Sequence, residues 1–250
     1  MEQIEYRFRI VKSGLHAPVG AKEIWHGDVA RQQASQWIPN GLHPELFHHD
    51  ADGACAQGLP LIRWAGGAGF FRIIAVGIAA IEVVEVAVTT LVRCALDNGV
   101  LLSVEPVRQS VSLEYSPFPV TYHLHRVMYG KKPKIHKKVG IPALNGDFEP
   151  LKTYLTERIA RDIDRQSYLL GMQDTVIQAS DIRVDTVENL TLGELHHANG
   201  KTLTAACCDA VVRIPALLTG HWAVGAAISR GYGGLRAPLA SSFSLSEDAA

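Results

Sequence analysis

The pattern of hydrophobic and polar positions predicts six elements in the first 110 residues, in the order strand, helix, strand, strand, helix, strand. The first segment alternates with the two-residue period of a half-buried strand, and the second places its apolar residues near one helical face. A glycine-rich stretch at residues 65–69 separates two apolar runs, as a hairpin loop does. The predicted elements cover residues 6–11, 20–37, 59–64, 70–76, 78–96 and 100–107.

Residues 78–96 are the most apolar run in the chain, and their polar positions decide between strand and helix. Glu82, Glu85, Thr89 and Arg93 are spaced three, four and four residues apart, which forms one polar stripe on an otherwise buried helix. Three charges within the run also argue against a membrane span. The resulting order is that of a ferredoxin-like domain, with an antiparallel sheet, both helices on one face and the other face free. RNA-recognition folds use such a face, although this fold hosts many functions.

The second half of the chain follows a less regular pattern. Residues 151–170 predict an amphipathic helix, because an apolar residue recurs at every fourth position. Its basic residues could extend a phosphate-binding track or only solvate the outer face. Strands are expected at residues 175–184 and 203–214, a short helix at 217–229, and a frayed tail after residue 240.

Composition describes a globular protein of one large or two small domains. Of 250 residues, 47% are hydrophobic and 20% are charged, which excludes a disordered chain. The net charge of −1 excludes indiscriminate affinity for nucleic acid, so any RNA surface must be a local patch. The four cysteines lack the paired spacing of a zinc ribbon, and no signal peptide is evident, so we expect free thiols and a cytoplasmic location.

Basic residues concentrate in a stretch that contains no carboxylate. Between Glu114 and Asp147 there is no acidic residue. Tyr122 and Tyr129 are interleaved with the charges, so we expect an exposed, mobile loop that binds RNA; the alternative is a solvated charge run. The residues predicted to bind RNA here are Arg126, Lys131, Lys132, Lys134, Lys137 and Lys138.

Four glycines follow an apolar run near the C-terminus. Successive N–H groups in such a segment can form an anion-binding concavity, and flanking arginines suit phosphate. The alternative is a tight turn between two core elements. Neither a Walker lysine nor a dinucleotide fingerprint is present, which makes nucleic acid the first candidate ligand. The predicted binding residues are Arg230, Gly231, Gly233, Gly234 and Arg236, and Gly225 precedes them.

Three segments resemble the repeat-associated RNA-binding superfamily of CRISPR systems, and within it the crRNA-processing endoribonucleases. Residues 46–50 (LFHHD) with 59–64 (LPLIRW) are similar to the family's "HNH … YPLIQY" segment. Residues 69–77 are similar to its third strand, and residues 225–233 (GAAISRGYG) to its last element, which ends in glycine, an aromatic residue and glycine. By size and general character, the processing enzymes of type IV systems are the nearest subfamily.

The resemblance implies an α+β fold of two ferredoxin-like (RRM-like) domains in tandem. The expected domains are residues 1–110 and 111–250; the second is imperfect and carries a basic helical insertion at about 126–172 and the glycine-rich loop at 225–236. The implied function is cleavage of precursor crRNA beside a repeat stem-loop, without metal or another cofactor. The implied partners are that stem-loop and the subunits of the CRISPR effector complex, with no membrane.

The implied cleavage chemistry needs a proton acceptor for the 2′-hydroxyl, a proton donor for the leaving 5′-oxygen and a cation beside the phosphate. The resemblance places the proton-transfer residue on or just after the first helix. The candidates are His26, which lies on that predicted helix, and His48, which lies in the segment similar to "HNH". Arg31 is the candidate cation. A site dominated by arginine is the alternative to a histidine site.

Two other functions compete with this one. A noncatalytic subunit that holds the crRNA handle would share the fold and the glycine loop. A metal-dependent hydrolase would instead use the cluster of His43, His48, His49 and Asp50.

Overall fold

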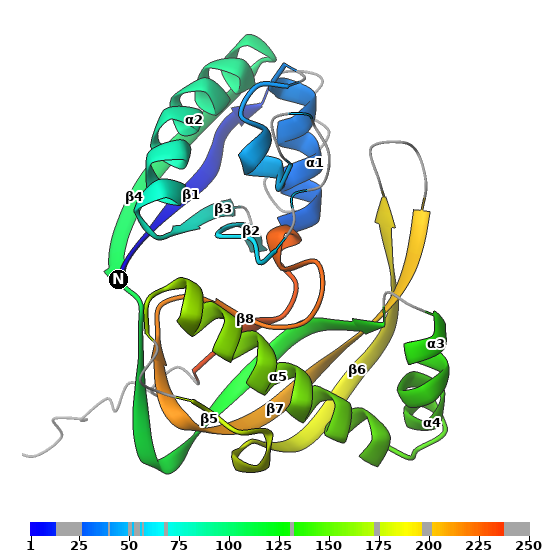
Figure 1. Ribbon diagram of the computed structural model, residues 1–250. Helices are drawn as coiled ribbons and strands as arrows, with labels where there is room; N and C mark the ends of the chain where they lie inside the picture. The colour runs from blue at the N-terminus through cyan, green and yellow to red at the C-terminus, as the bar shows by residue number, and fades with distance from the viewer. Residues whose placement is uncertain are drawn as a thin grey trace, which may run out of the picture.

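The computed structural model describes residues 1–13, 27–39, 41–49, 52, 56, 58–67, 70–130, 133–172, 176–196 and 202–237. These residues form two antiparallel sheets, one from each half of the chain, as the predicted α+β class requires. Figure 1 shows the N-terminal sheet and its helices above the C-terminal sheet. A segment from the C-terminal half, drawn in orange, reaches up between them.

The N-terminal sheet has the strand order β2-β3-β1-β4, and every neighbouring pair is antiparallel. The elements follow the predicted order, and α1 and α2 lie on one face of the sheet (Figure 1). Their bounds are β1 (Glu2–Ser13), α1 (Gly27–Trp37), β2 (Ile62–Gly67), β3 (Phe70–Val76), α2 (Ile78–Asp97) and β4 (Val100–Ser110). A short 3-10 helix, η1 (Pro44–Phe47), lies between α1 and β2.

Stacked aromatic rings form the centre of the N-terminal core. Phe71 stacks on Phe8 with ring centroids 4.6 Å apart, and Trp64 stacks on Phe71 at 6.0 Å. The polar stripe of α2 is confirmed, because the four residues that define it are all exposed. The sheet face opposite the two helices was expected to be uncovered. This is only partly right, since Ala65, Ile74 and Val76 on that face are buried in the core of the C-terminal half.

The C-terminal sheet has the strand order β6-β7-β5-β9-β8. The order β6-β7-β5-β9 repeats that of the N-terminal sheet, and α5 packs its predicted apolar stripe into the core. Between β7 and β9, where the first sheet has α2, the described chain has only β8 and the 3-10 turn η4. The bounds are β5 (Ser112–Gly130), α5 (Glu149–Leu169), β6 (Arg183–His196), β7 (Thr202–Thr219), β8 (Trp222–Ala223), η4 (Ile228–Arg230) and β9 (Gly234–Arg236).

Two predictions for the C-terminal half are wrong at this level. Residues 217–229 form no helix but the end of β7, then β8 and the start of η4, because Gly220 and Gly225 adopt positive φ angles that interrupt a helix. Of the strand expected at 175–184, residues 176–178 have no regular structure, residues 179–181 form a 3-10 turn, η3 (Ala179–Asp181), and β6 starts only at Arg183.

The basic stretch is not a mobile loop over its first part. The strand β5 continues to Gly130, and Tyr122 and Tyr129 are buried in the core of the C-terminal half. Beyond it, short helical segments form a helical insertion before α5: α3 (Pro133–Ile135), η2 (His136–Gly140) and α4 (Ile141–Leu144). None of the helices in the described part of the chain combines the length and apolar character that a membrane crossing needs.

A buried arginine joins the two halves. Arg63 of β2 is 2% exposed, and its guanidinium donates to the Gln166 side-chain oxygen at 2.9 Å and to the His221 carbonyl at 2.9 Å. A third donor, Nε, reaches the Pro60 carbonyl at 3.2 Å. Burial lowers the pKa of Arg63 to about 10, so the side chain still carries its charge at neutral pH.

The neighbours of Arg63 are suited to this charge. Burial, followed by the positive charge of Arg63, lowers the pKa of His221 well below its ordinary value, so the ring is neutral. Its Nδ1 lies 3.3 Å from the Arg63 guanidinium. On the same loop, the backbone N–H of His221 donates to the Gln3 side chain of β1 at 2.8 Å. The turn after β7 is therefore tied to two strands of the N-terminal sheet.

We expect Arg63→Ala to lower the free energy of unfolding by about 2–4 kcal/mol, because buried acceptors are then left without a charged donor. Chemical denaturation measures this change. Arg213→Ala is the matched control, since Arg213 binds Asp185 at the surface of the C-terminal sheet. The control should leave stability nearly unchanged. Equal stability of the two variants would contradict the role of Arg63 as the link between the halves.

Candidate nucleic-acid interface and active site

The glycine-rich segment lies at the junction between the two sheets. Gly231 has φ 85°, and a Cβ placed there would come within 2.5 Å of the Trp64 carbonyl oxygen in β2. Gly27, at the start of α1, also lies close to the segment: a Cβ placed there would come within 2.7 Å of the Arg230 carbonyl oxygen. Glycine at both positions therefore lets α1, β2 and η4 meet at backbone distance.

The remaining glycines fold the segment onto the C-terminal sheet. At Gly233, which has φ 73°, a Cβ would lie 1.7 Å from the Val224 carbonyl oxygen. At Gly225, which has φ 96°, it would lie 2.8 Å from Val127 and 3.0 Å from the Met128 carbonyl oxygen. These glycines therefore permit close contact with the protein's own atoms. This is what we expect if the segment is a tight turn between two core elements.

The backbone N–H groups of the segment are also used internally. Gly225 donates to the Asp162 carboxylate at 2.7 Å, Gly231 to the Ile228 carbonyl at 3.0 Å, and Gly233 to the His125 carbonyl at 3.0 Å. The expected concavity of N–H groups turned toward an anion is therefore not formed by these three. Contact between RNA and the exposed atoms of the segment, including Arg230, Gly234 and Arg236, stays a prediction.

The carboxylate of Asp162 organises this segment from α5. It is 1% exposed and accepts from Arg158 Nε at 2.5 Å as well as from Gly225. Arg158 also donates to the Gly225 carbonyl at 2.6 Å. The charge of Arg158 is therefore used within the fold, whereas Arg161 and Arg165 on the same helix are exposed.

Arg126 belongs to the glycine-rich segment in space, although it belongs to the basic stretch in sequence. Its guanidinium lies 4.7 Å from the centroid of the Tyr232 ring, a cation–π contact. The Tyr232 hydroxyl in turn donates to the Asp28 carboxylate of α1 at 3.3 Å. Burial, followed by the charge of Asp28, raises the pKa of Tyr232 to about 12, so this hydroxyl keeps its proton at neutral pH. Sequence reasoning missed Tyr232 and Asp28, because only the fold brings them together.

Arg31 lies one turn after Asp28 on α1 and faces η1. Its guanidinium donates to the Phe47 carbonyl and lies 5.5 Å from the centroid of the Phe47 ring. His48 caps η1 in a left-handed conformation, with φ 57°, and is partly buried. The structure thus places Arg31 and His48 on neighbouring elements. His26 lies outside the described residues.

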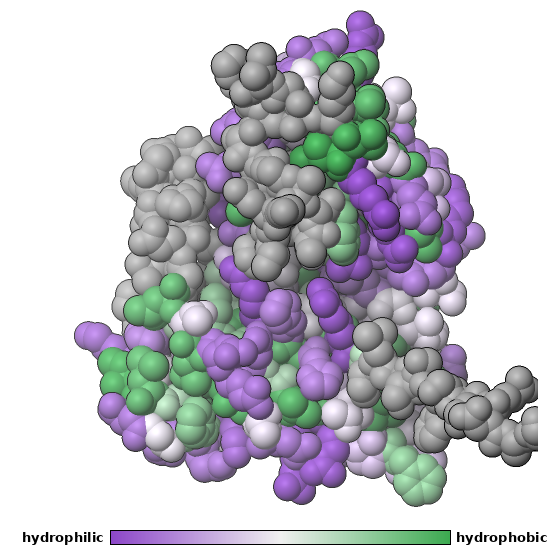
Figure 2. All heavy atoms as spheres, turned by 180° about the vertical axis from the view of Figure 1, so that it is seen from behind, coloured by the Kyte–Doolittle hydropathy of each residue, from purple (hydrophilic) through white to green (hydrophobic). Residues whose placement is uncertain are grey.

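Lysines of the helical insertion form a second basic surface. Lys134, Lys137 and Lys138 are exposed on α3 and η2, whereas Lys131 and Lys132 lie outside the described residues. Arg126 and Arg236 stand apart from them on β5 and β9. Partial burial lowers the pKa of Arg236, and the positive charge of nearby Arg72 lowers it further. The predicted RNA-binding residues therefore occupy two places, the insertion and the sheet junction. Figure 2 shows hydrophilic side chains gathered across the middle of one face of the molecule.

The predicted metal cluster is not assembled by the described residues. His43 makes a hydrogen bond to the Thr90 hydroxyl of α2 at 3.1 Å, and no group of three His, Cys, Asp or Glu side chains in the described ranges could share an ion. Asp50 lies outside those ranges.

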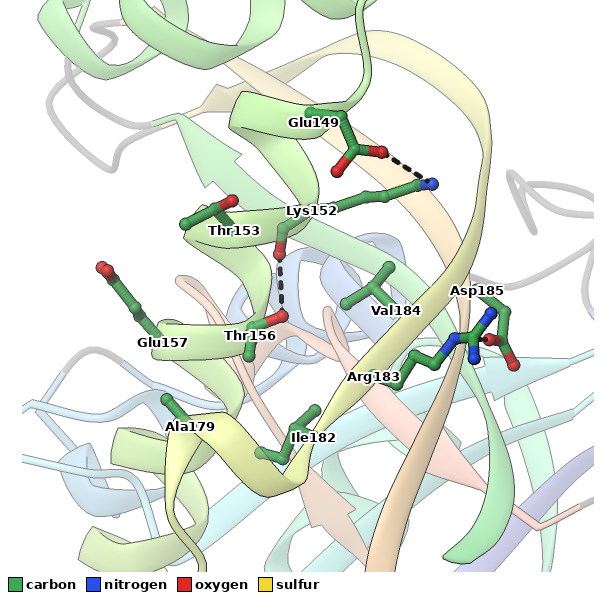
Figure 3. A pocket seen from close by; sticks show the side chains of 10 residues that line it. All are labelled: Glu149, Lys152, Thr153, Thr156, Glu157, Ala179, Ile182, Arg183, Val184 and Asp185. Atoms are coloured by element: carbon green, nitrogen blue, oxygen red, sulfur yellow. Dashed lines mark hydrogen bonds and ion pairs between the residues drawn. The ribbon is translucent and has the colours of Figure 1, made fainter.

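A groove of about 540 Å³ lies between α5 and the start of β6 (Figure 3). Its walls carry charges of both signs, including Glu149, Lys152 and Asp185. Arg183 binds Asp185 at 2.9 Å, and Lys152 binds Glu149 at 3.1 Å. Because these charges neutralise one another, the groove presents no net positive charge to a phosphate backbone.

Comparison with known proteins finds relatives of one kind. Residues 15–238 match the family model described as "Type IV CRISPR-associated endonuclease Csf5". A solved structure titled "Csf5, CRISPR-Cas type IV Cas6 crRNA endonuclease" is similar with a TM-score of 0.70 and 18% identity, over 95% of this chain and 100% of that one. "Crystal structure of Cas6b" is similar with a TM-score of 0.58 and 16% identity, over the same shares of the two chains. Among curated proteins, none matches.

We expect Gly233→Ala to lower the free energy of unfolding by about 3 kcal/mol or more, because the new Cβ overlaps the Val224 carbonyl and the φ angle is strained. Gly146→Ala is the matched control: Gly146 also has positive φ, at 91°, but a Cβ there meets no atom within 4 Å. The control should show only the cost of the φ angle, about 1–2 kcal/mol. Thermal unfolding measures both. Loss of RNA binding by Gly233→Ala at unchanged stability would instead favour an anion-binding concavity formed by the segment.

Proposed function

Because the chain belongs to the family of type IV CRISPR-associated Csf5 endonucleases, we propose that it cuts precursor crRNA beside the stem-loop of each repeat and keeps the mature crRNA for the effector complex. The observation that carries this proposal is the family match over residues 15–238. The fold is compatible with it, since two sheets with the same strand order meet at a junction that carries arginines from both halves. The reaction is proposed to take place in the cytoplasm.

The proposed chemistry is attack of the 2′-hydroxyl on the adjacent phosphate without a metal ion. The product is a 2′,3′-cyclic or 3′ phosphate and a 5′-hydroxyl. Arg31 is proposed to stabilise the charge on the phosphate, and His26 and His48 to transfer protons. The position of Arg31 on α1, one turn from the Asp28–Tyr232 contact, supports a site at the junction.

The proposed binding surface has two parts. Lysines of the insertion hold the stem-loop, and Arg126, Arg230 and Arg236 hold the strand that passes the junction. We further propose that residues 1–110 and 111–250 are two ferredoxin-like domains. The repeated strand order supports this, and the second domain is imperfect because η4 and β8 stand where a helix is expected.

We expect purified protein to cleave repeat RNA in excess EDTA. His26→Ala should slow single-turnover cleavage by about 10²–10⁴-fold, as loss of a residue that transfers a proton does. Arg31→Ala should slow it by about 10²–10³-fold, as loss of a charge interaction in the transition state does. RNA affinity should stay within a few fold.

Arg31→Lys is the control for the contact between Arg31 and Phe47, since it keeps the charge but changes the packing. Rescue of cleavage by lysine would support the charge role. Binding without cleavage by the native protein would point to the noncatalytic subunit. Cleavage that EDTA abolishes would point to the metal-dependent hydrolase.

Neutralising Lys131, Lys132, Lys134, Lys137 and Lys138 together should weaken RNA binding and flatten its salt dependence. The slope of log K against log salt concentration should fall by about 0.7–0.9 for each lysine that binds a phosphate in the native protein, because fewer counterions are released. Titrations at several salt concentrations measure the slope. Arg183→Gln, in the groove between α5 and β6, is the control and should change neither quantity. An unchanged slope in the lysine variant would mean that the stretch is only solvated.

A further inference from the structure

A carboxylate on the C-terminal sheet holds an exposed histidine in a fixed orientation. Asp209 lies on β7, between β5 and β6 in the sheet. Its Oδ1 is 3.3 Å from Nδ1 of His125, and the His125 side chain is 48% exposed. Since a carboxylate can only accept, Nδ1 carries the hydrogen, and the neutral ring presents Nε2 as a free proton acceptor.

Two strained residues complete the hold on Asp209. Arg126 has φ 48° and Asn189 has φ 51°, and each lies where the register of its strand shifts against β7. The Arg126 N–H donates to Asp209 Oδ1 at 2.6 Å, and the Asn189 side chain donates to Oδ2 at 2.8 Å. Bulges and left-handed residues other than glycine cost free energy and concentrate at functional sites. Here two such residues, Arg126 in β5 and Asn189 in β6, lie on opposite sides of β7 and donate to the same carboxylate.

The position of His125 fits contact with RNA. A hollow of about 140 Å³ opens beside it, lined also by Glu188, Asn189 and Asp209. Arg126, the next residue, reaches Tyr232 and through it Asp28 of α1. His125 is thus the neighbour in β5 of the residue that links this strand to the glycine-rich segment and to α1, and the proposed RNA path along the junction would include it.

The charges around the ring come from each neighbouring strand. Asp209 of β7 and Glu188 of β6 are negative, and Arg126 of β5 and Arg236 of β9 are positive. Burial is the largest effect and lowers the pKa of His125; the two arginines lower it further, while Asp209 raises it. The ring is consequently neutral at pH 7, which is the state that a proton acceptor requires.

We infer that His125 is a catalytic proton acceptor of the RNA-cleavage site and that Asp209 is the residue that positions its ring. The inference rests on the proposed function. In the step, the proton of the 2′-hydroxyl moves to Nε2 of His125 as the 2′-oxygen forms its bond to phosphorus. The bond between phosphorus and the 5′-oxygen breaks, and the 5′-oxygen leaves with the electron pair and takes a proton from His26 or His48, the proton-transfer residues of the proposed function. In the order β6-β7-β5-β9, Arg126 and Arg236 lie on β5 and β9 and Glu188 lies on β6, so we propose that the phosphate is held on the side of β5 and β9.

The test is single-turnover cleavage of repeat RNA in EDTA at saturating protein, from about pH 5 to pH 8. His125→Ala should slow cleavage by about 10²–10⁴-fold and remove the fall in rate toward acid pH. His125→Gln should behave alike, and it keeps a donor for Asp209 in case the alanine variant does not fold.

Asp209→Asn should shift the acid limb of the profile to lower pH, because the charge that raises the pKa of His125 is gone. Arg236→Gln should shift it to higher pH for the opposite reason. If the role of Asp209 were purely structural, Asp209→Asn would not shift the acid limb. Asp185→Asn is the control, because it eliminates a carboxylate of β6 in the same sheet. It should leave the rate and the pH profile unchanged.

Two results would overturn the inference. If both His125 variants cleave within a few fold of the native protein while His26→Ala is slow, the proton acceptor is His26 and the proposed function stands. If the native protein binds repeat RNA but does not cleave it, both the inference and the proposed function fail.

Discussion

The structure depends on burying one charge, the guanidinium of Arg63, between two sheets. Within the part of the chain that the structure describes, no carboxylate forms an ion pair with it; its partners there are carbonyl and amide oxygens and the ring of His221. Such an arrangement is stable only where every donor finds an acceptor at good distance, because an unsatisfied buried charge is far more costly than a satisfied one. The two halves therefore have little freedom to shift. Because β2 is fixed against α5 and β8, the glycine-rich segment that follows β8 is fixed as well.

That constraint explains why the glycines are where they are. The segment after β8 must pass between the Trp64 carbonyl of β2 and the start of α1, and a side chain at Gly231 would collide with that carbonyl. The same crowding brings Tyr232 into contact with Asp28 and Arg126, which come from opposite halves of the chain. The motif that resembles a phosphate loop is thus first a device for joining two sheets. The same segment gathers arginines and polar side chains along the junction.

Charge is distributed so that a nearly neutral protein can still present positive surfaces. Several basic residues are neutralised within the fold, such as Arg158 by Asp162 and Arg213 by Asp185. Lys134, Lys137 and Lys138 on the helical insertion and Arg236 on β9 are instead exposed. A net charge of −1 with such local patches favours selective over indiscriminate RNA binding.

The sequence alone determined the elements of the N-terminal half, because hydrophobic period and turn residues are local properties: β3 and α2 match their predicted bounds to within a residue, and the polar stripe of α2 is exposed. It determined the family as well, since the three segments that resemble the family occur in the family's order along the sequence. It failed where side chains far apart in sequence decide the outcome. Residues 217–229 were predicted as a helix from their apolar character. In the structure β8 pairs with β9 and η4 packs against β2, and these contacts with distant segments cannot be read from the apolar pattern. Tyr122 and Tyr129 looked like part of an RNA-binding loop because strand burial depends on β7, about 90 residues later. Only the tertiary structure places Asp209 beside His125, and Tyr232 beside Asp28, since register shifts and positive φ angles in separate strands bring these groups together.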